Sequence, residues 1–162
     1  MKASVLTVSD RVSRGEAEDG SGPAAAELLA DLGFDVFELR VVHDGVESVA
    51  AALKAMIPNA NLIVTSGGTG FSRRDLSPEG TAQVIERSAP GLAEALRADT
   101  FGRNPHGMLS RGIAGICGET LIVNLPGSER AVRESLAVIL PALRHAVELL
   151  IEPASDHNVT SH

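Results

Sequence analysis

The chain has 162 residues, of which 44% are hydrophobic, 22% charged and only 2% aromatic, and its net charge of −7 gives a pI near 5.2. These values are typical of a single globular domain. The acidic balance argues against general binding of nucleic acid or of an anionic membrane, and the absence of Trp and Tyr argues against stacking of single-stranded nucleic acid. The lone cysteine, Cys117, excludes an internal disulfide and a thiolate metal cage, and we expect it to be a buried structural thiol.

The N-terminal third of the chain is predicted to alternate strands with helices. Residues 3–9 and 35–43 have the apolar, β-branched character of strands. Between them, residues 22–33 are predicted to form a helix, because Gly22-Pro23 can start it and Gly33 can end it. A second helix is expected over residues 44–56, with Asp44 as its N-cap and Glu47 in the capping-box position.

The middle of the chain contains a third strand and two further helices. Residues 62–65 form an apolar run that predicts a buried strand, and the loop TSGGTGFSRRDLSPEG, residues 65–80, follows it. Ser77-Pro78 has the pattern of an N-cap and first turn for a helix through Arg87. Another helix is expected to start at Pro90.

The last third is predicted to contain a strand pair and a long helix. Residues 112–117 and 120–125 are joined near Gly118, so they are expected to pair antiparallel, and residues 128–150 show helical apolar periodicity with a kink at Pro141. The fold class is therefore α/β: a doubly wound, mostly parallel sheet with helices on both faces and a short antiparallel edge strand. Residues 1–151 are expected to form one domain, and 152–162 a disordered tail.

Candidate functional residues gather where the predicted strands end. In an open α/β sheet, ligands bind beyond the carboxyl ends of the strands. The first two strands end at Ser9-Asp10 and at Asp44, the third at residues 66–70, and the strand at 120–125 ends at residues 126–128. Each of these ends carries glycine or polar oxygen ligands, which makes this edge the expected site.

The loop at 65–80 does not match either familiar nucleotide-binding pattern. It has no lysine for a Walker loop, and Arg73 occupies the third glycine position of the GxGxxG pattern, so hydride transfer with a nicotinamide cofactor is disfavoured. Its glycines could aim backbone N–H groups at an anion, or could simply form a turn that binds nothing. The histidines show no metal-ligand spacing and no GxSxG elbow exists, so zinc catalysis and acyl transfer are poorly supported.

The charged residues of this edge have two interpretations. Taken singly, Asp44 and Asp75 could cap local turns, and Arg73 and Arg74 could be solvated loop charges. Taken together, two carboxylates and two arginines around a glycine-rich loop suit Mg²⁺ bound to substrate phosphates, with arginine neutralising phosphoryl charge. One arginine is expected to face phosphate and the other solvent, and Arg74 is the candidate for phosphate.

The order of these motifs resembles a known family. SDR near the start, Asp44, GGTG, RDLSPEGT, MLSR and NLPGS together resemble the molybdopterin adenylyltransferases of the Mog/MoaB type, over about residues 5–150. Ser77 stands where the family more often has threonine, which keeps the hydroxyl. The resemblance implies an enzyme of molybdenum cofactor biosynthesis that uses ATP and Mg²⁺ to transfer AMP to the terminal phosphate of molybdopterin, with release of pyrophosphate.

The resemblance also implies roles for particular residues. Asp44 and Asp75 match the essential acids, and they are expected to hold Mg²⁺ and orient the triphosphate; no general base is needed, because a phosphate monoester with a second pKa of about 6 is already a dianion at neutral pH. The positions that match the substrate pocket are Ser9, Asp10, Gly67, Gly68, Thr69, Gly70, Ser110, Pro126, Gly127 and Ser128.

The resemblance implies a homo-oligomer, with a trimer favoured over a hexamer, and leaves room for hand-over of the product to a molybdate-insertion protein. A cytoplasmic location is expected, because the sequence begins without a signal peptide and contains no apolar stretch near 20 residues. The alternative is a non-catalytic molybdopterin-binding or carrier paralogue. Related insertion proteins carry further domains that this sequence lacks, which disfavours an insertion role.

Overall fold

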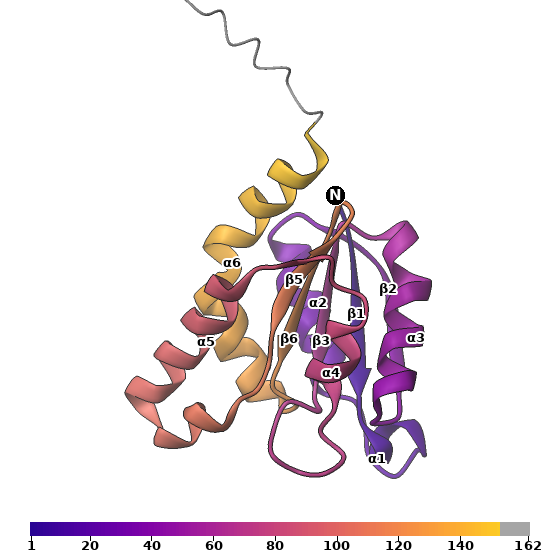
Figure 1. The fold of residues 1–162 in the computed structure, drawn as a ribbon, viewed down its shortest axis with the longest axis vertical. Coiled ribbons are helices and arrows are strands. Elements are labelled where there is room, and N and C mark those ends of the chain that lie inside the picture. The colour runs from indigo at the N-terminus through magenta and orange to yellow at the C-terminus, as the bar shows by residue number, and fades with distance from the viewer. Residues whose placement is uncertain (153–162) are drawn as a thin grey trace, which may run out of the picture.

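The computed structural model describes residues 1–152, in which one six-stranded sheet is covered by helices on both faces (Figure 1). The predicted tail, 152–162, lies outside the described residues except for Glu152. The strand order is β2-β1-β3-β6-β5-β4. The strands are β1 (Lys2–Val8), β2 (Asp35–Val42), β3 (Leu62–Ser66), β4 (Arg87–Ser88), β5 (Ala114–Cys117) and β6 (Thr120–Leu125).

The sheet is parallel over its first four positions and antiparallel at one edge. β1 pairs with β2 and β3, and β3 pairs with β6, all in parallel register. β5 runs antiparallel to β6 and β4 antiparallel to β5. Every residue of β3 and of β6 is buried, as expected for central strands that have helices on both faces. The predicted fold class is confirmed, including the antiparallel pairing of residues 112–117 with 120–125.

The helices form two hydrophobic layers. α2 (Ser21–Asp31), α5 (Pro90–Arg103) and α6 (Glu129–Ile151) contribute to the core on one face, and α3 (Val46–Met56) packs on the other, beside α4 (Ser77–Ala82). Figure 1 shows α5 and α6 on one side of the strands and α3 on the other. The shorter elements are α1 (Asp10–Ser13), η1 (Ile57–Asn59) and η2 (Pro105–Leu109). No helix in the described part of the chain has the length and apolar character needed to cross a bilayer.

Two predicted helix caps are wrong, and both residues have other contacts. Asp44 does not cap α3: Gly45, with φ of 145°, precedes that helix, and no side chain caps it. Leu76 occupies the N-cap position of α4, and the buried Ser77 hydroxyl donates instead to the Gly67 carbonyl, at 2.8 Å. In each case a contact distant in sequence replaces the local cap.

Other boundaries also differ from the prediction. α4 ends at Ala82 rather than continuing to Arg87, because Arg87 and Ser88 form β4 on the edge of β5. α5 ends at Arg103, and α6 runs through Pro141 to Ile151, where the kink stays a prediction. Cys117 is half-buried at the end of β5 rather than fully buried.

Candidate functional site

The carboxyl ends of the four parallel strands meet at one edge of the sheet, as the sequence predicts. The ends of β1 and β2 are tied reciprocally: the Asp10 N–H donates to Asp44 Oδ2 at 2.9 Å, and the Asp44 N–H donates to Asp10 Oδ1 at 3.1 Å. The ends of β3 and β6 are tied by the Gly67 N–H, which donates to the Leu125 carbonyl at 3.1 Å. These bonds fix the carboxylate of Asp44 at the edge of the sheet.

Arg74 completes this link. Its guanidinium binds Asp10 in bidentate fashion, with Nε–Oδ2 of 2.8 Å and Nη2–Oδ1 of 3.0 Å, and also donates to the Asp44 carbonyl at 3.1 Å. The hydrogen bond from Arg74 lowers the pKa of Asp10. The Arg74 side chain is 61% exposed. Arg74 thus supports the Asp10–Asp44 link in this structure, and its contact with a phosphate stays a prediction.

The glycines of the loop allow it to pass very close to its neighbours. Gly67 has φ of 95°, and a β-carbon there would lie 2.2 Å from the Val8 carbonyl oxygen. Gly68 has φ of 65°, and a β-carbon would lie 2.4 Å from Ser77 Oγ and 3.2 Å from Asp44 Oδ1. Any side chain at these two positions would be strained, and one at Gly68 would also fill the space beside Asp44.

The second half of the loop is held by Asp75 and by an arginine that the sequence analysis did not single out. Asp75 Oδ2 accepts the Ser72 N–H at 2.9 Å and closes a turn. Arg111 Nε donates to the Gly70 carbonyl at 2.8 Å, and its other nitrogens bind the Asp75 carbonyl and the Glu79 carboxylate. Its backbone N–H donates to the Thr69 carbonyl at 2.8 Å. Arg111 therefore fastens the GGTG segment to the segment that carries Asp75.

A cavity of about 410 Å³ opens at the strand ends, here called the acidic pocket. Of the described residues that line it, five carry carboxylates and none is Lys, Arg or His; the five are Glu18, Asp19, Asp44, Asp75 and Glu129. The loop glycines Gly67 and Gly68 and the hydroxyls of Ser9, Ser21 and Ser66 also line it. The pocket therefore suits a cation and hydrogen-bonding groups, and would repel a bare anion.

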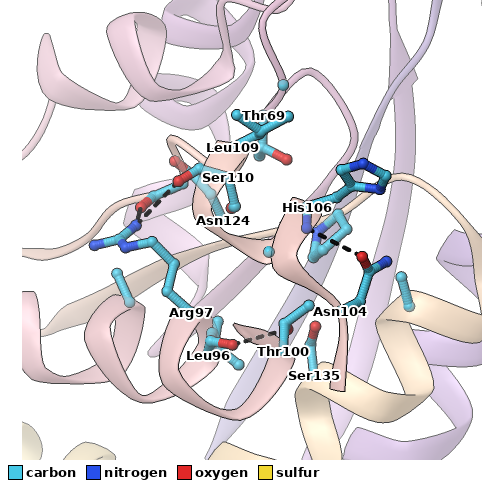
Figure 2. Close-up of a pocket in the computed structure, with 16 residues that line it drawn as sticks. Thr69, Leu96, Arg97, Thr100, Asn104, His106, Leu109, Ser110, Asn124 and Ser135 are labelled. Carbon is cyan, nitrogen blue, oxygen red and sulfur yellow. Dashed lines mark hydrogen bonds between the residues drawn. The ribbon is translucent and has the colours of Figure 1, made fainter. Parts of the chain in front are cut away.

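A second cavity of about 270 Å³, here called the helix pocket, lies against α5, η2 and α6. Adjacent residues divide the two cavities: Gly68 and Gly127 line the acidic pocket, whereas Thr69 and Pro126 line the helix pocket. Figure 2 shows the polar groups around the helix pocket: Arg97, Thr100, Asn104, His106, Ser110 and Ser135. The Arg97 guanidinium is held by the Gly112 carbonyl at 2.8 Å. This cavity mixes apolar walls with hydrogen-bonding groups, as small-molecule pockets do.

The donors in the acidic pocket fit a hard cation. Burial raises the pKa of Asp44, and the negative charges of Asp10 and Asp75 raise it further. A divalent cation beside Asp44 would stabilise its ionised form against this burial. Within residues 1–152, no cluster of three or more His, Cys, Asp or Glu forms a complete metal site. A cation held here would therefore need ligands from water or substrate, as Mg²⁺ commonly does.

The predicted site residues are divided between the two pockets. Ser9, Asp44, Gly67, Gly68, Asp75 and Gly127 line the acidic pocket, and Thr69, Gly70, Ser110 and Pro126 line the helix pocket. Three others line neither: Asp10 and Arg74 bind each other, and Ser128 caps α6 by accepting the Ala131 N–H at 3.1 Å.

Sequence reasoning missed Asp19 and Glu129 of the acidic pocket, and Asn104 and His106 of the helix pocket. Asp19 accepts hydrogen bonds from Thr7 Oγ1 at 2.7 Å and from the Gly22 N–H at 2.9 Å. These bonds position Asp19 in the pocket, and they form only when the loop before α2 folds against β1. The signal available for Glu129 was its position directly after the Ser128 cap of α6, at a strand end already identified as functional.

A doubly wound sheet with two pockets at its carboxyl edge, one acidic and one mixed, is the architecture of a ligand-binding α/β domain. Residues 4–145 match the family described as the probable molybdopterin binding domain. The chain belongs to this family, which confirms the resemblance.

Curated relatives include proteins named for molybdopterin and molybdenum cofactor synthesis. The chain is 37% identical over 151 residues to the molybdopterin adenylyltransferase of Helicobacter pylori (strain J99 / ATCC 700824), covering 91% of this chain and 86% of that one. It is 40% identical over 157 residues to gephyrin of Dictyostelium discoideum, covering 90% of this chain and 22% of that one. It spans 26% of molybdenum cofactor synthesis protein cinnamon of Drosophila melanogaster. The chain thus spans about a quarter or less of these two longer relatives.

Solved structures agree with the fold. The molybdopterin biosynthesis Mog protein from Mycobacterium ulcerans superimposes with a TM-score of 0.87 at 41% identity, covering 92% of this chain and 98% of that one. The tungsten cofactor synthesizing protein MoaB from Pyrococcus furiosus gives 0.85 at 33% identity, covering 93% and 97%.

Proposed function

We propose that this protein is a molybdopterin adenylyltransferase, which transfers AMP from ATP to the terminal phosphate of molybdopterin and releases pyrophosphate. A relative of which the chain covers 86% bears this name. The observation that carries the proposal is the acidic pocket itself. Among the residues that the structure describes, five carboxylates and no basic side chain line a cavity beside a glycine loop. Polyphosphate enters such a cavity only together with a cation, which is the requirement of an Mg²⁺–ATP enzyme.

Asp44 and Asp75 are the residues that would hold Mg²⁺. Both carboxylates line the acidic pocket, and each lies beside a loop glycine: Asp44 Oδ1 is 3.2 Å from a β-carbon built at Gly68, and Asp75 Oδ2 is 2.9 Å from one built at Gly70. When bound, the cation supplies neutralisation of phosphate charge. The chain's own part is to orient the two carboxylates through the Asp10 and Ser72 N–H groups.

We assign ATP to the acidic pocket and molybdopterin to the helix pocket. The heterocycle of a pterin needs hydrogen-bond donors and acceptors beside apolar surface, and Asn104, Ser110 and Ser135 offer these among apolar neighbours. The loop residues at the boundary of the two pockets, Gly68-Thr69 and Pro126-Gly127, would then lie between the α-phosphate of ATP and the terminal phosphate of molybdopterin. This arrangement brings the reacting groups together at one rim.

The reaction needs no general base from the protein. An oxygen of the terminal phosphate forms a bond to the α-phosphorus of ATP, the bond from that phosphorus to the bridging oxygen breaks, and pyrophosphate leaves with the electron pair. The attacking phosphate is a dianion at neutral pH, because its second pKa is about 6. The work left for the protein is to position two polyanions and to offset their repulsion.

Purified protein, mixed with molybdopterin, ATP and Mg²⁺, is expected to release pyrophosphate, and EDTA should stop the release. Asp75→Asn should abolish turnover while molybdopterin binding is kept. Asp31→Asn, at an exposed position at the end of α2, is the matched control and should turn over normally. Full turnover by Asp75→Asn would refute the assignment of Asp75. Tight molybdopterin binding without ATP consumption would instead favour a carrier.

The same proposal includes a cytoplasmic homo-oligomer built from trimeric units, and hand-over of the adenylylated product to a molybdate-insertion protein. Light scattering on the purified full chain measures the mass of the assembly. A monomer at working concentration would contradict the trimeric unit.

A further inference from the structure

The outer edge of the sheet at β2 exposes an apolar stripe. β2 pairs with β1 on one side and ends the strand order. Its residues alternate strictly in exposure, and the more exposed set is largely apolar: Phe37 is 43% exposed, Leu39 50% and Val41 38%. A long edge strand with exposed apolar side chains and a free backbone is the kind of surface that pairs with another strand.

The backbone of β2 can accept such a partner. The Val42 carbonyl accepts the Ser9 N–H at 2.9 Å, so Val42 directs its polar backbone groups toward the β1 side. Successive residues of a strand direct these groups to opposite sides. Leu39 and Val41 therefore direct theirs toward the free side. The register irregularity lies at the start of the strand, between the partners of Ala3 and Ser4, and leaves residues 38–42 in regular pairing.

The order of residues along β2 is complementary to its own reverse. In an antiparallel pair centred on Leu39, Leu39 faces Leu39 of the second copy, Phe37 faces Val41, and Glu38 faces Arg40. Because Leu39 directs its backbone groups outward, the Glu38–Arg40 positions become the non-hydrogen-bonded pairs, in which opposite side chains lie closest. Both apolar and charged faces are matched in this register.

Neighbouring registers are disfavoured by the same residues. A shift of the centre by one residue places Glu38 opposite itself or Arg40 opposite itself, with like charges in contact. A pairing centred between two residues places apolar side chains opposite charged ones. A parallel pair in register would align Glu38 with Glu38. Of these registers, the antiparallel one centred on Leu39 avoids both like-charge pairs and apolar–charged pairs.

We propose that β2 is a two-fold interface, through which a second copy of this chain adds its own β2 in antiparallel register centred on Leu39. Two six-stranded sheets then form one continuous sheet across the axis. Within one copy Glu38 and Arg40 already bind each other, with Nε–Oε1 of 2.8 Å, and in the pair each gains the opposite charge of the second copy. The interface joins dimers directly, or doubles a trimeric unit to a hexamer. It does not depend on the proposed transferase activity.

Charge reversal tests the register on the full-length chain. Glu38→Arg gives a strand with two arginines, and Arg40→Glu gives one with two glutamates, so each variant alone places like charges opposite each other. Each single variant should weaken association about tenfold or more and halve the mass at a fixed concentration. The double variant Glu38→Arg/Arg40→Glu restores opposite charges and should restore the mass. Sedimentation velocity over a concentration series measures all three.

A mixture of the two single variants gives the most decisive test of the register. The strand with two arginines faces the strand with two glutamates in the mixed pair, so the mixture should regain the wild-type mass while neither variant does so alone. Far-UV circular dichroism checks that both variants are folded, and pyrophosphate release should be unchanged in both. Unchanged mass in both single variants, or a mixture that stays at half mass, would overturn the proposal.

Discussion

Replacing Arg111 with alanine should disable the site without unfolding the protein. Arg111 is not expected to touch substrate; it binds the carbonyls of Gly70 and Asp75 and the carboxylate of Glu79, and so holds two arms of one loop together. Without it, both carbonyls lose a charged donor, and the carboxylate of Asp75 is no longer fixed relative to the loop glycines. We therefore expect the loss to appear in catalysis before it appears in global stability.

The size of the effect follows from the exposure of these groups. The Arg111 and Glu79 side chains are 32% and 41% exposed, so their ion pair contributes only about 0–1 kcal/mol. The two bonds to carbonyls contribute about 1 kcal/mol each after solvent competition. The ordered loop thus loses about 2–3 kcal/mol, which corresponds to a fall in kcat/KM of about 30- to 150-fold.

The assay is pyrophosphate release under limiting Mg²⁺–ATP, together with thermal unfolding. Arg111→Ala should lower kcat/KM as above, and the same loss of about 2–3 kcal/mol limits the fall in Tm to about 12 °C or less. Arg111→Lys keeps a charge near Glu79 but cannot fork between two carbonyls, so it should recover only part of the activity. Arg144→Ala removes an exposed Arg–Glu pair on α6 and is the control. Full activity in Arg111→Ala would refute the idea that the loop depends on this clamp.

Three further outcomes follow from the same contacts. Gly67→Ala should lower the free energy of unfolding by about 2 kcal/mol or more in urea titration, because of its positive φ and the Val8 carbonyl, whereas Gly91→Ala, with no atom within 4 Å, should not. Asn124→Ala, which removes three hydrogen bonds from a buried side chain, should cost about 2–4 kcal/mol in the same titration, and a cost near zero would contradict the contacts. The raised pKa of Asp44 means that, as the pH falls, this carboxylate protonates at a higher pH than an ordinary aspartate. We therefore expect kcat/KM for Mg²⁺–ATP to fall on acidification at a pH above about 4. A fall that begins only at or below about pH 4 would be inconsistent with the burial of Asp44.

The fold could be predicted where sequence and burial agree. Strands β1, β3 and β6 are short apolar runs bounded by glycine or polar residues, and their buried environment in the sheet matches those runs. The hairpin of β5 and β6 followed from a connection too short for a crossover. β4 could not be found in this way, because Arg87 and Ser88 have no apolar pattern and become a strand only through backbone pairing with β5.

The site was predictable in its acids and glycines, and not in its tertiary supports. Asp44 and Asp75 follow directly from their positions after strands, but their local patterns resemble helix and turn caps. Only the fold shows that Asp44 accepts the N–H of Asp10, 34 residues away. Likewise, Arg111 contacts a carbonyl 41 residues earlier in the chain, a relation that no spacing in the sequence records. The division into two pockets depends on how α5 and α6 pack. It could not be predicted from the positions at which the strands end.

The loops after β3 and β6 form the wall between the two pockets, and they meet backbone to backbone at Gly67 and Gly127. A β-carbon at Gly127 would lie only 3.1 Å from the Cα of Gly67. If the reaction joins a ligand in one pocket to a ligand in the other, the product spans this wall and keeps contacts on both sides. It would then leave more slowly than either substrate, since both halves must detach together. A product held in this way is protected from dilution until a recipient protein removes it, and it should compete with both substrates.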